Sequence, residues 1–216
     1  MKKQRDESEI SAIRERILSS ALSIFETEGF SQLTMRALAK KMDMTAPNLY
    51  NYFSGKDEIY LYLVIQGFTL LRDRFSEAEK AHPDPAERGR ALMAAYLAFG
   101  RENPAHYGLM FTHQTPKYND YVGTRLEKLS LQELTLSLEV AAIADRAFQD
   151  LARTTVGLSD LDARAGVIGV WGLLHGLVSL LHSGVVQYVA PDTDAVYQKV
   201  MDSCFSLLSL AGKNIP

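Results

Sequence analysis

Cysteine is nearly absent from this 216-residue sequence, since Cys204 is its single copy. One cysteine excludes a disulfide within the chain and a cluster of cysteine metal ligands, and it fits a reducing cytoplasm. The sequence also lacks the Asp/Glu-His spacing typical of a metal site and a glycine-rich phosphate loop after a strand. We therefore expect no metal, no cofactor and no catalytic residues, and we predict that the protein is not an enzyme.

Strand patterns, internal repeats and low-complexity tracts are missing as well. The N-terminus has no apolar stretch after its basic residues, so it does not look like a secretory signal. Apolar residues instead recur at steps of three and four, separated by proline and glycine stops. The sequence predicts a cytoplasmic, all-α protein of about nine helices.

Positive charge is in slight deficit, because the net charge is −3, and an acidic sum disfavours nucleic acid as a partner. The distribution matters more than the sum. Basic and acidic residues balance within residues 1–60, and residues 34–56 have a local basic excess. That stretch contains Arg36, Lys40, Lys41 and Lys56 against Asp43 alone.

The stretch 34–56 predicts two short helices joined by a tight turn. Thr34 can cap a helix that runs to Lys41, and Thr45 can cap a second helix that ends near Phe53. Two such helices at a steep angle are typical of a helix-turn-helix, whose second helix can enter a DNA major groove. Their shared core would consist of Leu38, Met42, Met44, Leu49 and Tyr52 or Phe53.

The first turn of the second helix suits contact with DNA because it is short and polar. Pro47 is tolerated there, since first-turn N–H groups have no partner within the helix. Asn48 suits adenine edges, and the Thr45 or Ala46 methyl suits a thymine methyl. Lys56, at the start of the next helix, suits a phosphate. The predicted DNA-binding residues are Thr34, Arg36, Thr45, Ala46, Pro47, Asn48, Tyr50, Asn51, Tyr52 and Lys56.

A longer pattern surrounds this motif: Arg16-Ile17-Leu18, Ala21, Phe25, Gly29-Phe30, Thr34-Met35-Arg36, Leu38-Ala39, Leu49-Tyr50, Phe53 and Lys56. Over residues 10–60 it resembles the N-terminal domain of the tetracycline-repressor-like (TetR) family of bacterial regulators. Asp43 departs from the glycine usual in that turn, and aspartate tolerates the left-handed conformation better than most residues. The resemblance implies a DNA-binding domain at 1–55, a connecting helix at 56–80 and a ligand-binding and dimerisation domain at 81–216.

No charged residue stands between Arg164 and Asp192. The length would allow a membrane span, but interspersed His, Gln and Ser and the lack of flanking Lys/Arg clusters favour a soluble protein without a membrane partner. We expect one helix over 160–188, buried on most of its surface. Its small residues recur on one face, which allows a second copy to approach closely. The predicted homodimer interface consists of Gly172, Gly176, Ser179, Ser183, Val200 and Cys204.

Two segments of this second half, Trp171-Gly172-Leu173-Leu174-His175-Gly176-Leu177 and residues 103–111, look like a C-terminal domain type of TetR-like regulators with a Trp-His-Gly signature. That resemblance implies a ligand-sensing, dimerising domain. Aromatic and apolar residues here could line a pocket between helices. Few of them are charged, which favours a neutral or hydrophobic small-molecule effector. The predicted pocket residues are Tyr96, Phe99, Tyr107, Met110, Phe111, Trp171 and His175.

The leading interpretation is a DNA-binding transcriptional regulator, a repressor in most members of such a family. It would bind a palindromic double-stranded DNA operator as a homodimer and be released by its effector. One alternative is a helical interaction protein that keeps the helix-turn-helix only as packing. Another is a small all-α enzyme, which only the presence of His106, His113, His175 and His182 supports.

Overall fold

The computed structural model describes residues 7–113, 115–155, 162–190 and 192–210. These ranges contain eleven α-helices, one 3-10 turn and one π-helical turn, and no strand among them. The all-α prediction is confirmed. The two helices beyond the expected nine are α7 (Tyr118–Tyr121) and α10 (Val186–Val189), of four residues each, and α6 (Pro104–Tyr107) is equally short. A helix of one turn is too short to show a hydrophobic period.

The chain forms two compact units. The first consists of the described parts of Met1–Phe68 and Asn103–Leu136, and the second of those of Thr69–Glu102 and Ser137–Pro216. The long helices α4 (Lys56–Ala81) and α8 (Glu127–Thr154) contribute residues to both units. Residues 103–136 therefore pack with the N-terminal helices. The functional division into 1–55, 56–80 and 81–216 stays a prediction.

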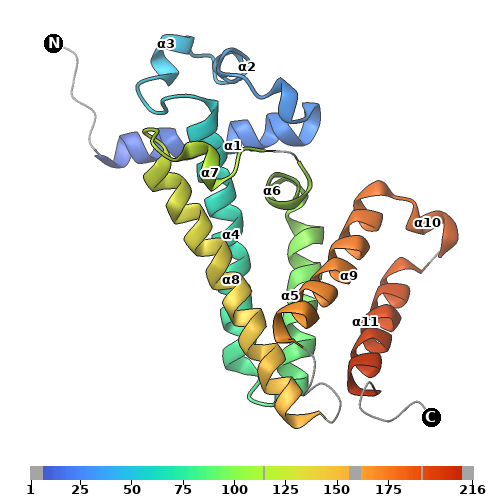
Figure 1. The fold of residues 1–216 in the computed structure, drawn as a ribbon. Coiled ribbons are helices and arrows are strands. Elements are labelled where there is room, and N and C mark those ends of the chain that lie inside the picture. The colour runs from blue at the N-terminus through green and yellow to red at the C-terminus, as the bar shows by residue number, and fades with distance from the viewer. Residues whose placement is uncertain (1–6, 114, 156–161, 191, 211–216) are drawn as a thin grey trace. The chain divides into compact units, whose positions relative to one another are not determined.

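The N-terminal helices of the first unit are α1 (Glu7–Glu28), α2 (Met35–Lys41) and α3 (Ala46–Leu49), with a 3-10 turn at Phe30–Gln32. Figure 1 shows α2 and α3 beside each other. The α1 helix ends at Glu28, just before Gly29, whose φ of 86° favours glycine and so marks a helix stop. Its apolar stripe is buried and includes Ile17, Leu18, Ala21, Ile24 and Phe25.

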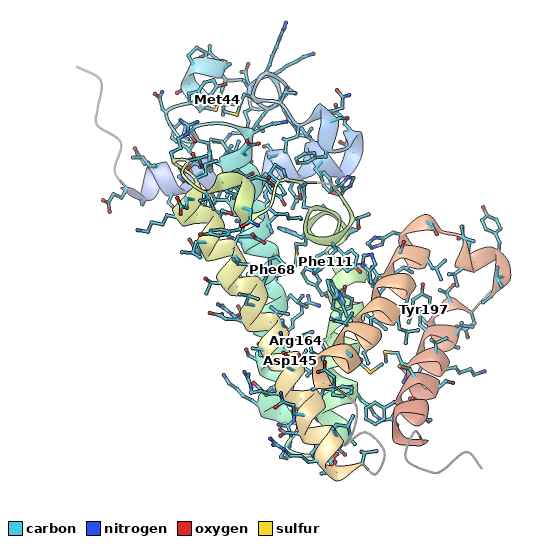
Figure 2. The ribbon with its side chains drawn as sticks, in the orientation of Figure 1. Met44, Phe68, Phe111, Asp145, Arg164 and Tyr197 are labelled. Atoms are coloured by element: carbon cyan, nitrogen blue, oxygen red, sulfur yellow. The ribbon has the colours of Figure 1, made fainter. Side chains whose placement is uncertain are left out.

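Residues 103–136 add α6, the π-helical turn Gly108–Thr112, α7 and the start of α8 to the first unit. The rings of Phe68 and Phe111 meet edge to face, with centroids 5.8 Å apart (Figure 2). Gly108 allows a close approach to α1, because a Cβ there would lie 3.0 Å from the Phe25 ring. Helices far apart in the sequence thus share one core.

The second unit contains α5 (Pro85–Glu102), α9 (Ala163–Ser183) and α11 (Thr193–Leu210), together with parts of α4 and α8. The α5 and α9 helices approach closely at Gly100, where a Cβ would lie 2.7 Å from both γ-methyl groups of Val178. The Tyr197 hydroxyl of α11, labelled in Figure 2, donates to the Leu177 carbonyl oxygen of α9 at 2.6 Å. These contacts join the last two long helices to the rest of the unit.

The helix expected over 160–188 is shorter in the structure, because α9 ends at Ser183. Gly184 follows with a φ of 68° and caps the helix in the left-handed conformation, the usual way in which glycine terminates a helix. The chain then turns into α10. The sequence also predicts a helix break at 157–159, which lies outside the described residues.

The expectation that this helix is buried on most of its surface is wrong for the single chain. Only 17% of the most apolar 18-residue window of α9 is buried, because α5 covers one narrow face of it. Among the described residues, α9 is also the helix that is long and apolar enough to cross a membrane, by length and composition alone. Its buried residues are Gly166, Leu174, Leu177 and Val178.

Candidate DNA-binding interface

The α2 helix and the turn after it follow the predicted pattern. Thr34 caps α2, since its Oγ1 accepts a hydrogen bond from the Ala37 N–H at 3.1 Å. The turn reverses at Asp43, which adopts the left-handed conformation with a φ of 54°. The Met44 N–H then donates to the Ala39 carbonyl oxygen at 2.9 Å. This tight turn sets the direction in which α3 leaves α2.

The α3 helix is shorter than the helix expected up to Phe53. It ends at Leu49, and the next residues form turns in which the Tyr52 and Phe53 N–H groups both donate to the Leu49 carbonyl oxygen, at 2.9 and 3.1 Å. Thr45 stands at the N-cap position without a capping hydrogen bond from its side chain. Leu49 is fully buried, so this one side chain anchors a single helical turn to the core.

The residues around that anchor face solvent. Tyr50 is 54% exposed, while Ala46 and Asn48 are half-buried. The Asn51 side-chain amide donates to the Asn48 side-chain oxygen Oδ1 at 3.3 Å, which leaves the Asn48 side-chain N–H groups to donate outward. The other exposed members of the predicted DNA-binding set are Thr34, Arg36, Thr45, Pro47, Asn51 and Lys56.

Tyr52 differs from the other predicted DNA-binding residues because it is only 7% exposed. The sequence allowed it two roles, in the shared core and at phosphate, and the structure puts most of this side chain in the core beside Phe53, which is 1% exposed. A phosphate contact by Tyr52 stays a prediction, and only the small exposed part of the side chain could make it.

Arg14 of α1 makes its contacts within the protein. Its guanidinium donates to the Tyr52 carbonyl oxygen and lies 4.0 Å from the centroid of the Phe53 ring. It also pairs with the Glu58 carboxylate at 3.7 Å. Arg14 therefore holds the chain just after α3. Its place in the sequence of an amphipathic helix does not reveal this role.

The start of α4 provides one cation and two carboxylates. Lys56 is exposed, with its ammonium 5.7 Å from the Phe30 ring centroid. The Glu58 carboxylate accepts a hydrogen bond from the Ser54 N–H at 2.6 Å, and Asp57 is half-buried beside it. A phosphate at this helix start would therefore depend on the Lys56 ammonium and the helix N–H groups, against the charge of Asp57.

A second group of polar contacts joins α4 to residues 115–133. The Tyr60 hydroxyl donates to Thr115 Oγ1 at 2.7 Å, and the Lys117 ammonium donates to the same oxygen at 3.2 Å. Burial raises the pKa of the Tyr60 hydroxyl and that of the Glu133 carboxyl, although Lys117 lowers the latter. Residues 115–119 have a sequence typical of a loop, which gives no sign of this link.

Arg125, just before α8, was also missed. Its guanidinium donates to the Ser54 carbonyl oxygen at 2.9 Å across 71 residues of sequence. No local pattern marks this arginine, because its importance depends on a contact that only the fold creates.

Two family models match this chain and together cover the helix-turn-helix and most of the remainder. Residues 17–63 match the model described as bacterial regulatory proteins, tetR family. Residues 90–204 match the model described as tetracyclin repressor-like, C-terminal domain. The chain belongs to the TetR family. It is a DNA-binding transcriptional regulator with a helix-turn-helix, as predicted.

Individual relatives agree with this assignment. The chain is 29% identical over 139 residues to the uncharacterized HTH-type transcriptional regulator YobS of Bacillus subtilis, covering 62% of this chain and 72% of that protein. It is 27% identical over 187 residues to the HTH-type regulator Rv0681 of Mycobacterium tuberculosis, covering 85% and 76%. A TetR-family regulatory protein of Rhodococcus RHA1 has the same fold, with a TM-score of 0.70 at 14% identity over 91% of this chain and 96% of that one.

The predicted effector residues of this TetR-family regulator divide between the two compact units. Tyr107, Met110 and Phe111 belong to the first unit, where Tyr107 is fully buried. The others belong to the second, where the Trp171 indole N–H donates to the Tyr96 hydroxyl at 2.8 Å. Phe99 is fully buried and His175 half-buried there. Their role in effector binding stays a prediction.

A groove of about 600 Å³ opens in the second unit of the regulator, between α5 and α11 near the end of α4. The guanidinium of Arg90 pairs with Asp202 at 2.9 Å and lies 4.2 Å from the Phe205 ring centroid. None of the predicted effector residues lines this groove. Its lining is His82, Glu87, Arg90, Ala91, Met93, Ala94, Gln198, Met201 and Asp202.

The small-residue face of α9 is uncovered within one chain. A Cβ added at Gly172 or Gly176 would meet nothing within 4 Å. Ser179 and Ser183 are exposed, and Val200 and Cys204 of α11 are half-buried. Burial raises the pKa of the Cys204 thiol, which disfavours the reactive thiolate. The close contact between α5 and α9 is made at Gly100, so Gly172 and Gly176 remain uncovered.

Proposed function

We propose that this regulator is a homodimeric repressor that places α3 in the major groove of each half of a palindromic operator. The exposure of Tyr50 above a fully buried Leu49 carries the proposal. That arrangement keeps the single turn of α3 rigid and turns its polar side chains outward. One such turn reads few base pairs, so two copies related by a two-fold axis would supply the length of a specific site.

The DNA contacts proposed here divide into two groups. Asn48 and the methyl groups of Thr45 and Ala46 would contact base edges. Thr34, Arg36, Tyr50, Asn51 and Lys56 would contact phosphates, which position the protein without reading sequence. Phosphate contacts release counterions, so each one adds to the salt dependence of binding.

Fluorescence anisotropy tests the proposal. The probe is the tightest duplex that the wild-type protein selects from a random-sequence pool, titrated at low and then rising salt. The Lys56→Gln variant should bind more weakly and lower the magnitude of the log–log salt slope by about one. Lys80→Gln is the matched control, because Lys80 is an exposed lysine in the last turn of the same helix. Equal affinities for the two variants, or failure to select any duplex, would count against the proposal.

The α9 helix supports a dimer with a second copy of this chain. Large apolar side chains stand exposed along it, including Ile168, Leu173 and Leu180, and its glycines leave room for another backbone. An uncovered apolar helix of this length is a feature of interaction surfaces. The symmetric partner required by a palindromic operator would cover it.

The proposed effector is a neutral, hydrophobic small molecule bound in the C-terminal helical domain. Trp171 is the only tryptophan of the chain, is 45% exposed and is hydrogen-bonded to the buried Tyr96. Its fluorescence therefore reports on this part of the domain. A true effector must bind the DNA-free conformation more tightly than the DNA-bound one. It should change Trp171 emission and weaken operator binding over the same concentration range.

A further inference from the structure

We propose that Arg125 is a positioning residue for the helix-turn-helix formed by α2 and α3. Arg125 would hold Ser54, which follows the helix-turn-helix, against the turn that precedes α8. The inference rests on the proposed DNA-binding function and adds to it a residue outside the helix-turn-helix. Arg125 lies within residues 90–204, which match the C-terminal family model, whereas Ser54 lies within residues 17–63, which match the N-terminal one.

Between α3 and α4, the segment 52–54 is held by side chains at three backbone groups. The Tyr52 carbonyl oxygen accepts from Arg14 of α1. The Ser54 N–H donates to the Glu58 carboxylate at 2.6 Å, and the Ser54 carbonyl oxygen accepts from Arg125 at 2.9 Å. Arg14 and Glu58 belong to the N-terminal helices and to α4. Arg125 alone among these three side chains comes from the C-terminal family segment.

The turn that carries Arg125 is closed by its own hydrogen bonds. Thr124 donates through its N–H and its hydroxyl to the Tyr121 carbonyl oxygen, at 3.0 and 2.7 Å. The Glu127 carboxylate accepts from the Gly123 N–H at 2.8 Å, and Gly123 has a φ of 77°, which favours glycine. The backbone at Arg125 is therefore fixed before its side chain reaches Ser54, so little backbone entropy is lost in forming the contact.

The same turn is anchored in the core of the first unit. Tyr121 is 5% exposed, and burial raises the pKa of its hydroxyl. A few residues earlier, Thr115 accepts from the Tyr60 hydroxyl of α4 at 2.7 Å. Residues 115–125 are thus fixed to α4 at one end and, at the other, to Ser54, two residues before α4. A displacement of the α8 start would pull directly on Ser54.

The guanidinium of Arg125 is exposed, so a direct phosphate contact is the competing role. The geometry favours positioning, because a nitrogen of Arg125 already donates to the carbonyl oxygen of Ser54, two residues before α4. The two roles differ in salt dependence. Loss of a phosphate contact lowers the magnitude of the log–log salt slope of DNA binding by about one. Misplacement of the helix-turn-helix instead lowers the affinity without removing a counterion-releasing group.

Three variants separate these roles on the duplex selected by the wild-type protein. Arg125→Gln removes the charge and the reach to Ser54, and we expect about 3- to 10-fold weaker binding with an unchanged salt slope. Lys128→Gln, an exposed residue one turn away, removes the same charge and should leave the affinity within about twofold. Arg125→Lys keeps one donor and should restore most of the affinity. A salt slope lowered by about one in Arg125→Gln, or equal affinities for Arg125→Gln and Lys128→Gln, would overturn positioning.

Amide hydrogen exchange of the DNA-free protein provides a readout independent of the operator. We expect faster exchange in the peptide containing residues 52–55 for Arg125→Gln than for Lys128→Gln, because one of its three restraints is gone. Unchanged exchange would overturn the inference even if DNA binding falls. If the wild-type protein selects no duplex, the repressor proposal fails, while faster exchange would still support the structural role of Arg125.

Discussion

Substituting Gly100 by alanine should destabilise the second unit, although alanine is the better helix former. In the native packing a Cβ at this position would lie 2.7 Å from both γ-methyl groups of Val178. Val178 is fully buried, and its β-branched side chain is restricted to few rotamers. The methyl groups therefore have little freedom to move aside, and α5 and α9 would have to separate.

The expected magnitude is the difference between two opposing effects. Overpacking a well-filled core costs about 1–3 kcal/mol, and replacing a helical glycine by alanine returns about 1 kcal/mol. Because the clash involves two methyl groups at once, we expect the upper part of the overpacking range and a net loss of about 1–2 kcal/mol. For a chain of this size that corresponds to a melting temperature lower by about 2–8 °C.

The assay is thermal unfolding at one fixed protein concentration, followed by circular dichroism, within a double-mutant cycle. Val178→Ala alone removes the two methyl groups and should cost about 2 kcal/mol by leaving a cavity. The Gly100→Ala/Val178→Ala variant should lose less unfolding free energy than the sum of the two single losses, by about 1 kcal/mol or more, because the new methyl enters the vacated space. Strict additivity would refute the packing argument.

Gly67→Ala is the matched comparison for Gly100→Ala. Gly67 is a second buried helical glycine, where an added Cβ would meet the sulfur of Met110 closely. Methionine is flexible and can rotate away, so this substitution should cost less than Gly100→Ala. A larger loss at Gly67 would show that the stiffness of the neighbouring side chain does not decide the outcome.

Two further substitutions test separate parts of the chain. Burial raises the pKa of the Glu133 carboxyl above the ordinary value of 4.5, so its ionised form disfavours folding. Glu133→Gln should therefore melt higher than wild type at pH 8, and the gap should close as the pH falls through the folded pKa towards 4.5; a gap independent of pH would contradict this. Gly172→Arg should convert the proposed dimer to monomers in sedimentation analysis, while Gln149→Arg, at an exposed position of α8, should not; a dimer that survives in both variants would exclude this face of α9 as the dimer interface.

Several helix boundaries were predictable because a residue with special backbone chemistry marks them. Thr34 caps α2, Gly29 follows the end of α1 and Pro85 occupies the first position of α5, each as its residue type favours. Gly184 is an equally good helix-terminating residue, but the uncharged stretch from 165 to 191 suggested that the helix continues to residue 188. The left-handed φ of Gly184 shows that the local backbone preference prevailed over that apolar pattern.

The tertiary contacts of the site were out of reach for the same kind of reasoning. Arg14 and Arg125 both reach the segment after α3, from 38 and 71 residues away. Neither position differs from an ordinary surface arginine in its neighbours along the chain. The exposed and buried positions of α3 could be predicted because one helical turn determines them, whereas the residues that hold α3 in place are determined by how distant segments fold together.

The uncovered face of α9 would make the regulatory response depend steeply on the amount of protein. If α9 pairs with its own copy as proposed, the operator-competent species forms by mass action from two chains. Below the dimer dissociation constant its concentration rises with the square of the chain concentration. A twofold change in synthesis or degradation would then change the amount of operator-competent dimer about fourfold. The apolar character of one helix face would thus set a concentration threshold for switching the target promoter.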